Sequence, residues 1–325
     1  MRFIRWGAAV SLALMANVIF AADAVTAVRE KAEAGDAAAQ LSLGEMYARG
    51  EGVARNPEEA VKWFRKAAER ENAIAQYNLG VIYAKGLGVT KDAAEAVMWL
   101  NMAAEHGNAA AQADLGLIYA TGDGVMKEPA QGLKWFRKAA EQGNIPAQYS
   151  LGVMYAHGDG VAKDSAEGVK WFRLAAAQGY AEAQNSLGGI YSNGDGVPKD
   201  LAEGARWFRL AAEQGNAAAQ CNLGLMYFNG TGVAKNHAEA ARWFRLAAEQ
   251  DNGLAQFQLG VMEAEGLGVT KDIVQACVWF MFAEKHGIPG AKKNDELLSK
   301  NFNVGQSTAA LKLYVELQGK MRKKK

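Results

Sequence analysis

The chain has 325 residues, of which 50% are hydrophobic, and its 36 basic and 35 acidic residues leave a formal net charge of +1. This balance implies neither a nucleic-acid nor an anionic-membrane partner. Only 5 prolines interrupt the chain, which suits a helical core rather than a disordered polymer. The two cysteines, Cys221 and Cys277, lie at different positions of a repeating pattern, so we expect buried free thiols and a fold that packing stabilises.

The first 24 residues form a distinct segment. Arg2 and Arg5 give it a basic start, residues 6–22 are apolar apart from a serine and an asparagine, and small residues follow. This pattern predicts a secretory signal peptide over residues 1–24, with cleavage after Ala24 or at the alanines just before it. The mature chain would then be exported, periplasmic or secreted, and would not span the membrane. A retained anchoring or buried helix is the alternative interpretation.

A 36-residue pattern then recurs seven times without insertion or deletion. Its tryptophans are Trp63, Trp99, Trp135, Trp171, Trp207, Trp243 and Trp279. Its glycines are Gly44, Gly80, Gly116, Gly152, Gly188, Gly224 and Gly260. A period of this size predicts an array of repeats, each of which buries its apolar face by stacking on its neighbours. We place these seven repeats at residues 37–288.

The second repeat shows how one unit is built. Apolar residues recur at helical spacing in Ala75, Leu79 and Tyr83, which predicts a first helix. The glycine-rich stretch 84–92 ends that helix, and Asp92 is a candidate N-cap for a second one. The apolar stripe of the second helix is Ala96, Trp99, Leu100, Ala103 and Ala104. Each unit is therefore expected to be an antiparallel pair of helices, closed in this repeat by Gly107.

Three recurring residues have packing interpretations. Glycine in the middle of a helix costs about 1 kcal/mol relative to alanine, so its recurrence at the position of Gly80 indicates a close helix–helix contact. Tryptophan at the position of Trp99 supplies the largest core side chain of each unit. Glutamine at the position of Gln76 is expected to hydrogen-bond either to a loop or to a neighbouring helix.

The motif resembles a known repeat family. In the fourth repeat it consists of Ala147, Gln148, Leu151, Gly152, Tyr155, Gly158, Gly160, Val161, Trp171 and Phe172. The spacing is similar to that of tetratricopeptide units, but the period is 36 rather than 34 and the loop between the helices is longer. The pattern is that of the Sel-1-like repeat family. This resemblance implies an all-α, right-handed α-solenoid that serves as a scaffold or adaptor between macromolecules. Exported bacterial members are associated with envelope signalling, assembly and host contact.

The two ends of the array depart from the motif. Residues 25–36 are interpreted as an N-terminal capping half-repeat, and residues 289–325 as C-terminal capping helices with a basic tail. The seventh repeat carries Glu263 where tyrosine is expected and Glu284 in place of alanine. We interpret this repeat as the transition into the C-terminal cap.

No catalytic, cofactor-binding or metal-binding residue is predicted, and no cofactor is expected. The four histidines neither cluster in the sequence nor share a position in the repeat, and the Gly-Asp-Gly turns lack the ligand pattern of calcium loops. Ser-Xaa-Xaa-Lys, Ser-Asp-Asn and Lys-Thr-Gly motifs are missing from the sequence. A non-enzymatic scaffold is therefore favoured. The alternatives are a weak cell-wall or β-lactam hydrolase and a peptidoglycan- or glycan-binding module.

A basic row follows the second helices. It consists of Lys134 and Arg137, Lys170 and Arg173, Arg206 and Arg209, and Arg242 and Arg245. Glutamates lie three residues before the first base of most pairs and four residues after the second, and such spacings predict solvated ion pairs worth about 0.2–0.5 kcal/mol each. The row is therefore interpreted as a solvated surface rather than a polyanion track.

Two positions of the first helix vary strongly among the repeats, whereas the core positions hardly change. They lie seven residues apart, hence on one helix face, and aromatic residues lie next to them. The candidate protein-binding residues are Tyr77, Asn78, Lys85, Asp114, Tyr149, Ser150, His157, Asn193, Asn222, Asn229, Phe257 and Gln258. We expect them to line the concave face of the array and to bind another protein or peptide. Ordinary drift of surface residues is the alternative.

A second candidate surface lies on the second helix of the second repeat. At the two positions of the basic row and at the position after them, this repeat carries Met98, Asn101 and Met102. The seventh repeat carries Val278, Met281 and Phe282 there, and we expect the C-terminal cap to cover this surface. The second repeat has no such cap, so its methionines are expected to form an exposed apolar spot suited to a partner.

Overall fold

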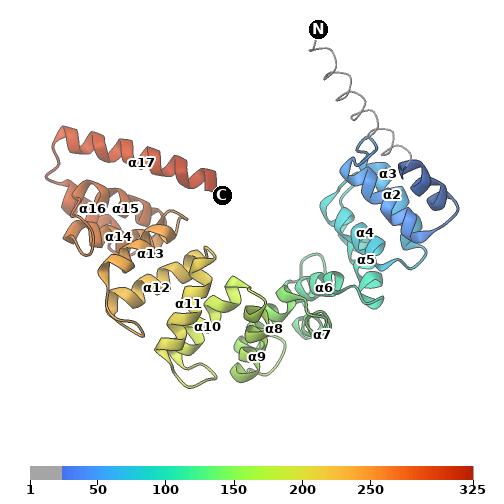
Figure 1. Ribbon diagram of the computed structural model, residues 1–325, viewed down its shortest axis with the longest axis horizontal. Helices are drawn as coiled ribbons and strands as arrows, with labels where there is room; N and C mark the ends of the chain where they lie inside the picture. The colour runs from blue at the N-terminus through green and yellow to red at the C-terminus, as the bar shows by residue number, and fades with distance from the viewer. Residues whose placement is uncertain (1–23, 325) are drawn as a thin grey trace, which may run out of the picture. The chain divides into compact units, whose positions relative to one another are not determined.

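The structure is a computed structural model that describes residues 24–324 of the chain. The signal peptide predicted over residues 1–24 lies, apart from Ala24, outside this range. All regular elements between residues 24 and 324 are helices (Figure 1). The all-α class predicted from the sequence is therefore confirmed.

Each repeat contributes two helices, and corresponding helices of successive repeats start 36 residues apart. The first helices are α2 (Ala37–Arg49), α4 (Ala73–Lys85), α6 (Ala109–Thr121), α8 (Ile145–His157), α10 (Ala181–Asn193), α12 (Ala217–Asn229) and α14 (Gly253–Glu265). The second helices are α3 (Pro57–Ala68), α5 (Ala93–Glu105), α7 (Pro129–Glu141), α9 (Ser165–Ala177), α11 (Leu201–Glu213), α13 (His237–Ala248) and α15 (Ile273–Lys285). Two further helices, α16 (Ala291–Ser299) and α17 (Val304–Lys324), follow the array.

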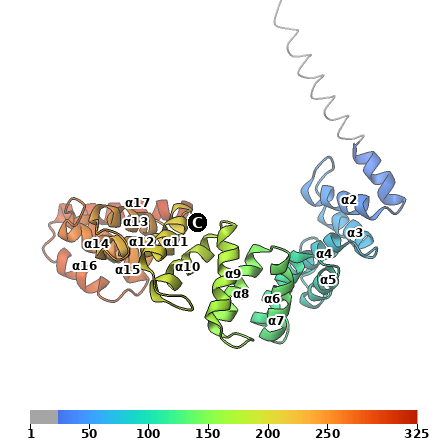
Figure 2. The same cartoon turned by 60° about the horizontal axis from the view of Figure 1, so that its bottom comes forward.

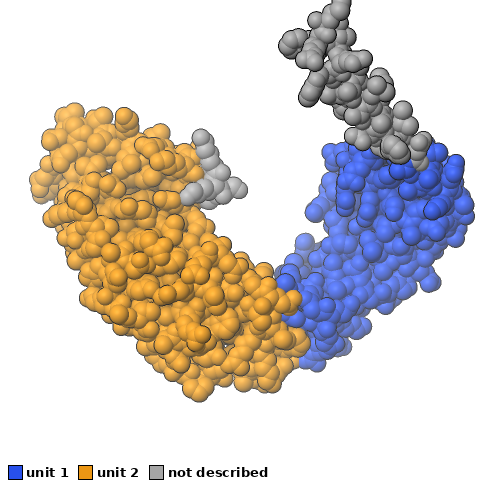
Figure 3. Space-filling model, viewed as in Figure 1, with its two compact units in different colours: residues 1–154, 158–162 blue, residues 155–157, 163–325 orange. Residues whose placement is uncertain are grey.

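The helices form two compact units, which Figure 3 shows in separate colours. Unit 1 comprises residues up to 154 together with 158–162, and unit 2 comprises residues 155–157 and 163–325. Within each unit a first helix packs against the second helix of its own repeat, and that second helix packs against the first helix of the next repeat. Figure 2 shows this alternation from another side.

The helix ends follow the capping expected from the sequence. The Asp92 carboxylate accepts a hydrogen bond from the backbone N–H of Glu95 at 3.0 Å, so this predicted N-cap is confirmed. Every first helix ends at a glycine in the left-handed conformation, such as Gly86 with φ 72°, where a side chain would cost energy. The second turn of the repeat also needs a positive φ, and there Glu71 and Asp251 stand in place of glycine with φ 61° and 70°.

The mid-helix glycine makes room for an aromatic ring. A Cβ atom at Gly116 would lie 2.6 Å from the ring of Phe136, and one at Gly188 would lie 2.5 Å from Phe208. Real Cβ atoms do not approach other atoms that closely. The close helix–helix contact predicted from these glycines is confirmed. In repeats one to three and five to seven the residue after the tryptophan is the partner, a phenylalanine except for Leu100 in the second repeat.

The tryptophans connect successive repeats. Trp99 of α5 belongs to the hydrophobic cluster built by α3 and α4, and Trp135 of α7 belongs to the cluster of α5 and α6. Five of the seven tryptophans are buried, but Trp171 and Trp207 are only half-buried. The expectation that this tryptophan is a core side chain in every repeat is therefore wrong for these two.

Buried glutamines run through the array as a hydrogen-bonded ladder. Gln112 Nε2 donates to the carbonyl of Ala104 at the end of the preceding second helix, 2.9 Å away. Gln112 Oε1 accepts from Gln142 Nε2 at 2.7 Å. Of the two partners left open by the sequence, the neighbouring helix is the one that the glutamine contacts, and the turn at the end of its own repeat completes the ladder.

The C-terminal cap covers the last second helix. The rings of Phe282 and Tyr314 stack with centroids 4.4 Å apart, and Val278 is fully buried. Ala310 and Met321 of α17 belong to the same cluster. The expectation that the cap covers Val278 and Phe282 is confirmed.

Candidate functional site

The candidate binding residues all lie on first helices, and the two compact units share them. Unit 1 holds Tyr77, Asn78, Lys85, Asp114, Tyr149 and Ser150, whereas unit 2 holds His157, Asn193, Asn222, Asn229, Phe257 and Gln258. The residues near the middle of each helix are half-buried, and those at its end, such as Lys85, are exposed. They are therefore partly accessible surface positions.

In unit 1 the structure brings Tyr77 and Asp114 together. The Tyr77 hydroxyl donates a hydrogen bond to the Asp114 carboxylate. Burial raises the pKa of Asp114, although the Tyr77 hydrogen bond and the charge of Lys85 oppose this shift. Burial also raises the pKa of Tyr77, and the nearby Asp114 carboxylate adds to the effect. This pair places a partly desolvated acceptor on the first-helix face.

Tyr149 and Ser150 border a cavity of about 290 Å³ between the third and fourth repeats. Its apolar lining includes Leu117 of α6, Phe136 of α7 and Val153 of α8. Lys127 and Asp159, from two successive loops, add opposite charges to the lining. A recess of this kind suits an apolar side chain that arrives with polar neighbours.

The sequence did not point to the apolar lining of this cavity. Leu117 is 56% exposed, and only its place in the array distinguishes it from scattered surface leucines, which are normal. A usable signal was present next to it. The third repeat carries Ala113 at the position of Tyr77 and Tyr149, and this small side chain leaves more open space on the first-helix face than an aromatic ring would.

In unit 2 several candidate residues contact neighbouring residues of the array. Asn222 Nδ2 donates to Asn185 Oδ1 at 3.3 Å, and Asn193 Nδ2 donates to Asp195 at 3.2 Å. The ring of Phe257 lies 5.6 Å from that of Phe280 on α15. Phe257 therefore contributes to helix packing, which makes it a weaker candidate for an anchor than Tyr149.

The basic row on the second helices is largely engaged within the protein. Glu167, Glu203 and Glu239 pair with the first base of their repeats, at 2.7, 3.2 and 3.1 Å. These pairs confirm the ion pairs predicted at three-residue spacing. Arg173 and Arg209, the second bases of their repeats, donate instead to the hydroxyls of Tyr191 and Tyr227 in the next repeat, contacts that the sequence did not predict.

The seventh repeat replaces that tyrosine by Glu263. Its carboxylate is only 2% exposed and pairs with Arg245 Nη2 at 2.9 Å. Burial raises the pKa of Glu263 to about 7, against the opposing effect of Arg245. The substitution therefore preserves an acceptor for the arginine of the preceding repeat.

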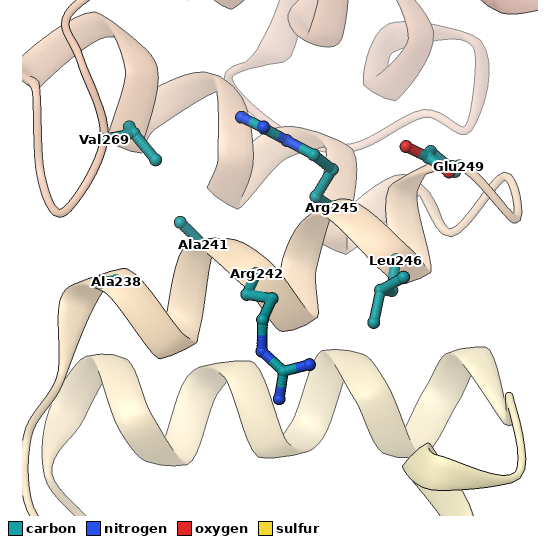
Figure 4. A pocket seen from close by; sticks show the side chains of 7 residues that line it. All are labelled: Ala238, Ala241, Arg242, Arg245, Leu246, Glu249 and Val269. Carbon is teal, nitrogen blue, oxygen red and sulfur yellow. The ribbon is translucent and has the colours of Figure 1, made fainter.

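Shallow grooves lie beside this row in unit 2. One is lined by Arg242, Arg245, Leu246 and Val269 and has a volume of about 280 Å³. Its counterpart one repeat earlier, lined by Arg206, Arg209, Leu210 and Val233, measures about 420 Å³. Figure 4 shows Arg242 and Arg245 extending in different directions from α13. Because Glu239 and Glu263 hold their guanidinium groups, the groove in Figure 4 is not a free anion site.

Comparison with known proteins identifies the repeats. The Sel1 repeat matches residues 37–72, 73–108, 109–144, 145–180, 181–216, 217–252 and 253–296. The chain belongs to the Sel1 repeat family. The match confirms the resemblance seen in the sequence, and the fold is the α-solenoid of seven helix pairs that it implied. The last Sel1 match runs into α16.

Two solved structures are similar to this chain. A Sel1 repeat protein from Oxalobacter formigenes is 35% identical, over 83% of this chain and 78% of that one, with a TM-score of 0.71. A protective antigen with an SLR fold from uropathogenic Escherichia coli strains is 31% identical, over 92% and 80%, with a TM-score of 0.46. The comparison with curated proteins found no match. Sel1 repeats generally mediate protein–protein interactions and are generally non-catalytic.

Three further observations concern the thiols, metal ligands and helix lengths of the described residues. Burial raises the pKa values of the Cys221 and Cys277 thiols to about 12, so neither is a ready nucleophile. Within residues 24–324 no group of three histidine, cysteine or acidic side chains could hold a metal ion. No helix in the same range is long and apolar enough to cross a membrane.

Proposed function

We propose that this chain is an exported, non-enzymatic Sel1-repeat scaffold that binds another protein or peptide along its first helices, on the concave face of the array. The observation that carries the proposal is the cavity beside Tyr149 and Ser150. It lies where first-helix residues vary from repeat to repeat around an unchanging core. Variable polar positions around an apolar recess are what selective recognition of a peptide requires.

The lining of the cavity suggests how a peptide would bind. An apolar side chain would enter against Leu117, Phe136 and Val153, and burying one such side chain is worth about 1.5–3 kcal/mol. The hydroxyls of Tyr149 and Ser150 would hydrogen-bond to polar groups next to it. One anchor of this size gives weak binding, so further contacts along the first helices would supply the remaining affinity.

The test compares two substitutions at the same position of different repeats. Val153→Trp fills the cavity, whereas Val81→Trp makes the same change on α4, at a residue that does not line it. Partners would be captured with the purified chain from the envelope fraction of the source cells. We expect Val153→Trp to lose the captured protein and Val81→Trp to retain it. Equal capture by both variants would refute binding at this cavity.

Two further measurements address export and catalysis. The basic and apolar pattern of residues 1–24 supports export, so removing those residues should keep the chain in the cytoplasmic fraction. Turnover of nitrocefin by the purified chain would refute the non-enzymatic proposal. Retention on purified peptidoglycan, undiminished by Val153→Trp, would favour a glycan-binding module instead.

A further inference from the structure

Repeats two and seven share a loop sequence, and an apolar residue at one outer position of the second helix, that the other repeats lack. The loop between their helices reads Gly-Leu-Gly-Val-Thr-Lys-Asp in both, over residues 86–92 and 266–272. At two outer positions of the second helix they carry Met98 and Met102, and Val278 and Phe282. The other repeats carry a base at the first of these positions: Lys62, Lys134, Lys170, Arg206 and Arg242. Repeat two is therefore built like the repeat that carries the C-terminal cap.

In repeat seven the helix α17 packs on these two apolar positions. Phe282 stacks on Tyr314 of α17, and Val278 is fully buried. The apolar residues of α17 that belong to the cluster of Val278 and Phe282 recur at helical spacing and so form one face of α17, its apolar ridge. They are Ala310, Leu313, Tyr314, Leu317 and Met321. The chain thus shows how an amphipathic helix packs on these two positions of a second helix.

In repeat two the corresponding surface is open. Met98 is 44% exposed, and Met102 is half-buried at the edge of the cluster that α3 and α4 build. Leu87, in the shared loop, is 47% exposed, whereas its counterpart Leu267 packs against the cluster that includes α17. Within residues 24–324, no helix covers the apolar residues of repeat two as α17 covers their counterparts in repeat seven.

Lysines flank this open surface on both sides. Trp99 joins α5 to the cluster of α3, and Trp135 joins α7 to that of α5, so the three second helices lie next to one another. At the positions of the two methionines, α3 carries Lys62 and Lys66, and α7 carries Lys134 and Lys138, all of them exposed. The Lys66 and Lys138 ammonium groups lie over the rings of Trp63 and Trp135, at 4.1 and 4.5 Å. Lys62 Nζ also pairs with Glu59 at 2.6 Å, so the positive charge beside the apolar centre comes mainly from Lys66, Lys134 and Lys138.

We propose that the Met98–Met102 face of α5 is a docking site for an acidic amphipathic helix of another protein. The helix would lay its apolar ridge on the methionines, as α17 does on α15, and its acidic flanks would face the lysines of α3 and α7. Methionine side chains adapt to the contour of such a ridge, and helices commonly bind in this way. This site is independent of the first-helix cavity.

Charge argues against a second copy of the chain as the occupant. The outward side of α17 also exposes apolar residues, Leu311 at 60% and Val315 at 66%. However, residues 291–325 contain nine basic and three acidic residues. Bringing this segment against the lysines of α3 and α7 would place like charges together, which opposes binding.

The test uses two peptides and the full chain. Both peptides correspond to residues 304–324 and keep the α17 ridge; one has the native charges, and the other has its lysines and arginine replaced by glutamate. Binding of each fluorescein-labelled peptide is followed by anisotropy. We expect the acidic peptide to bind, more weakly as salt rises, and the native-charge peptide to bind at least about tenfold more weakly.

Three variants make the result specific to the site. Met98→Lys with Met102→Lys should weaken binding of the acidic peptide about tenfold or more. This change installs residues that repeats one and three already carry there, so the fold should tolerate it. Leu210→Lys, the same change at the Met102 position of repeat five, should leave binding unaltered. Lys134→Glu with Lys138→Glu should weaken binding of the acidic peptide and strengthen binding of the native-charge peptide. Absent binding of the acidic peptide, or equal binding to the methionine double variant, would overturn the proposal.

Discussion

The junction between repeats five and six and the junction between repeats six and seven make the same contact with different chemistry. At the first, Arg209 donates to the hydroxyl of Tyr227, a neutral acceptor. At the second, Arg245 reaches the buried carboxylate of Glu263. Both arginines occupy the same position of their repeats, and both partners lie 18 residues further along the chain.

This difference shows what the tyrosine position requires. The arginine needs an oxygen acceptor from the next repeat, and either a phenol or a carboxylate supplies it. The carboxylate has a cost that the phenol lacks, because a buried charge must be desolvated before its ion pair stabilises anything. The raised pKa of Glu263 reflects that cost, so the last junction should respond to pH in a way that the others do not.

The largest expected effect tests whether a recurring residue has the same energetic role in each repeat. Trp243 is 5% exposed. Replacing it by alanine should lower the free energy of unfolding by about 3–5 kcal/mol. Trp171→Ala should cost clearly less, because Trp171 is only half-buried. Thermal unfolding followed by circular dichroism would measure both. Equal losses would show that exposure does not distinguish the two positions.

A change at Glu263 tests the comparison of the two junctions directly. Because burial raises the pKa of Glu263 from 4.5 to about 7, the folded chain keeps this proton over a range in which the unfolded chain has lost it. The stability that this residue contributes is therefore highest below about pH 4.5 and falls as the pH rises towards 7. The loss should amount to about 3 kcal/mol, since the shift is about 2.5 pKa units and one unit corresponds to about 1.4 kcal/mol.

Glu263→Tyr restores the residue of the other repeats and should remove this dependence. We expect the variant to gain stability over the parent chain at pH 8 and to gain much less at pH 5. Urea unfolding at the two pH values measures the difference, and Glu263→Gln serves as the control that keeps the shape but not the charge. A gain that is the same at both pH values would mean that Glu263 does not titrate in this range.

The smallest effect concerns the turns that close repeats one and six. Glu71→Gly should stabilise the chain by about 0.5–1 kcal/mol, because glycine adopts the positive φ of this turn without strain. Asp251→Gly should stabilise it less, since His286 Nε2 lies 2.9 Å from Asp251 Oδ1 and that contact would be lost. Differential scanning calorimetry would compare the variants. A larger gain from Asp251→Gly than from Glu71→Gly would show that the contact with His286 does not stabilise this turn.

Much of the fold could be predicted from the sequence because its determinants are local. The spacing of Ala75, Leu79 and Tyr83 specifies a helix face, and Asp92 and Gly86 specify helix ends. The glycine at the position of Gly80 also indicated a close contact, since its cost in a helix needs a compensating reason. The partner of that glycine required the structure, because it depends on how two helices cross.

The contacts between repeats were harder to predict. The partner of Gln76 and the arginine–tyrosine contact join residues whose proximity depends on the rotation of one helix pair against the next. The cavity beside Tyr149 depends on the same geometry, because Leu117, Phe136 and Val153 come from three helices. From the sequence, Glu263 was interpreted as part of the transition into the C-terminal cap. Only the structure showed that Arg245 is its partner.

The glutamine ladder has a mechanical consequence. In repeat three, for example, Gln112 joins the end of the preceding helix pair to the closing turn of its own, so each buried amide bonds across one boundary between helix pairs. A chain pulled from its two ends should therefore yield at these boundaries one after another rather than all at once. Each rupture would release 36 residues, or about 12 nm of extended chain. Optical-tweezer traces should then show a series of unfolding steps with similar rupture forces and similar increases in extension.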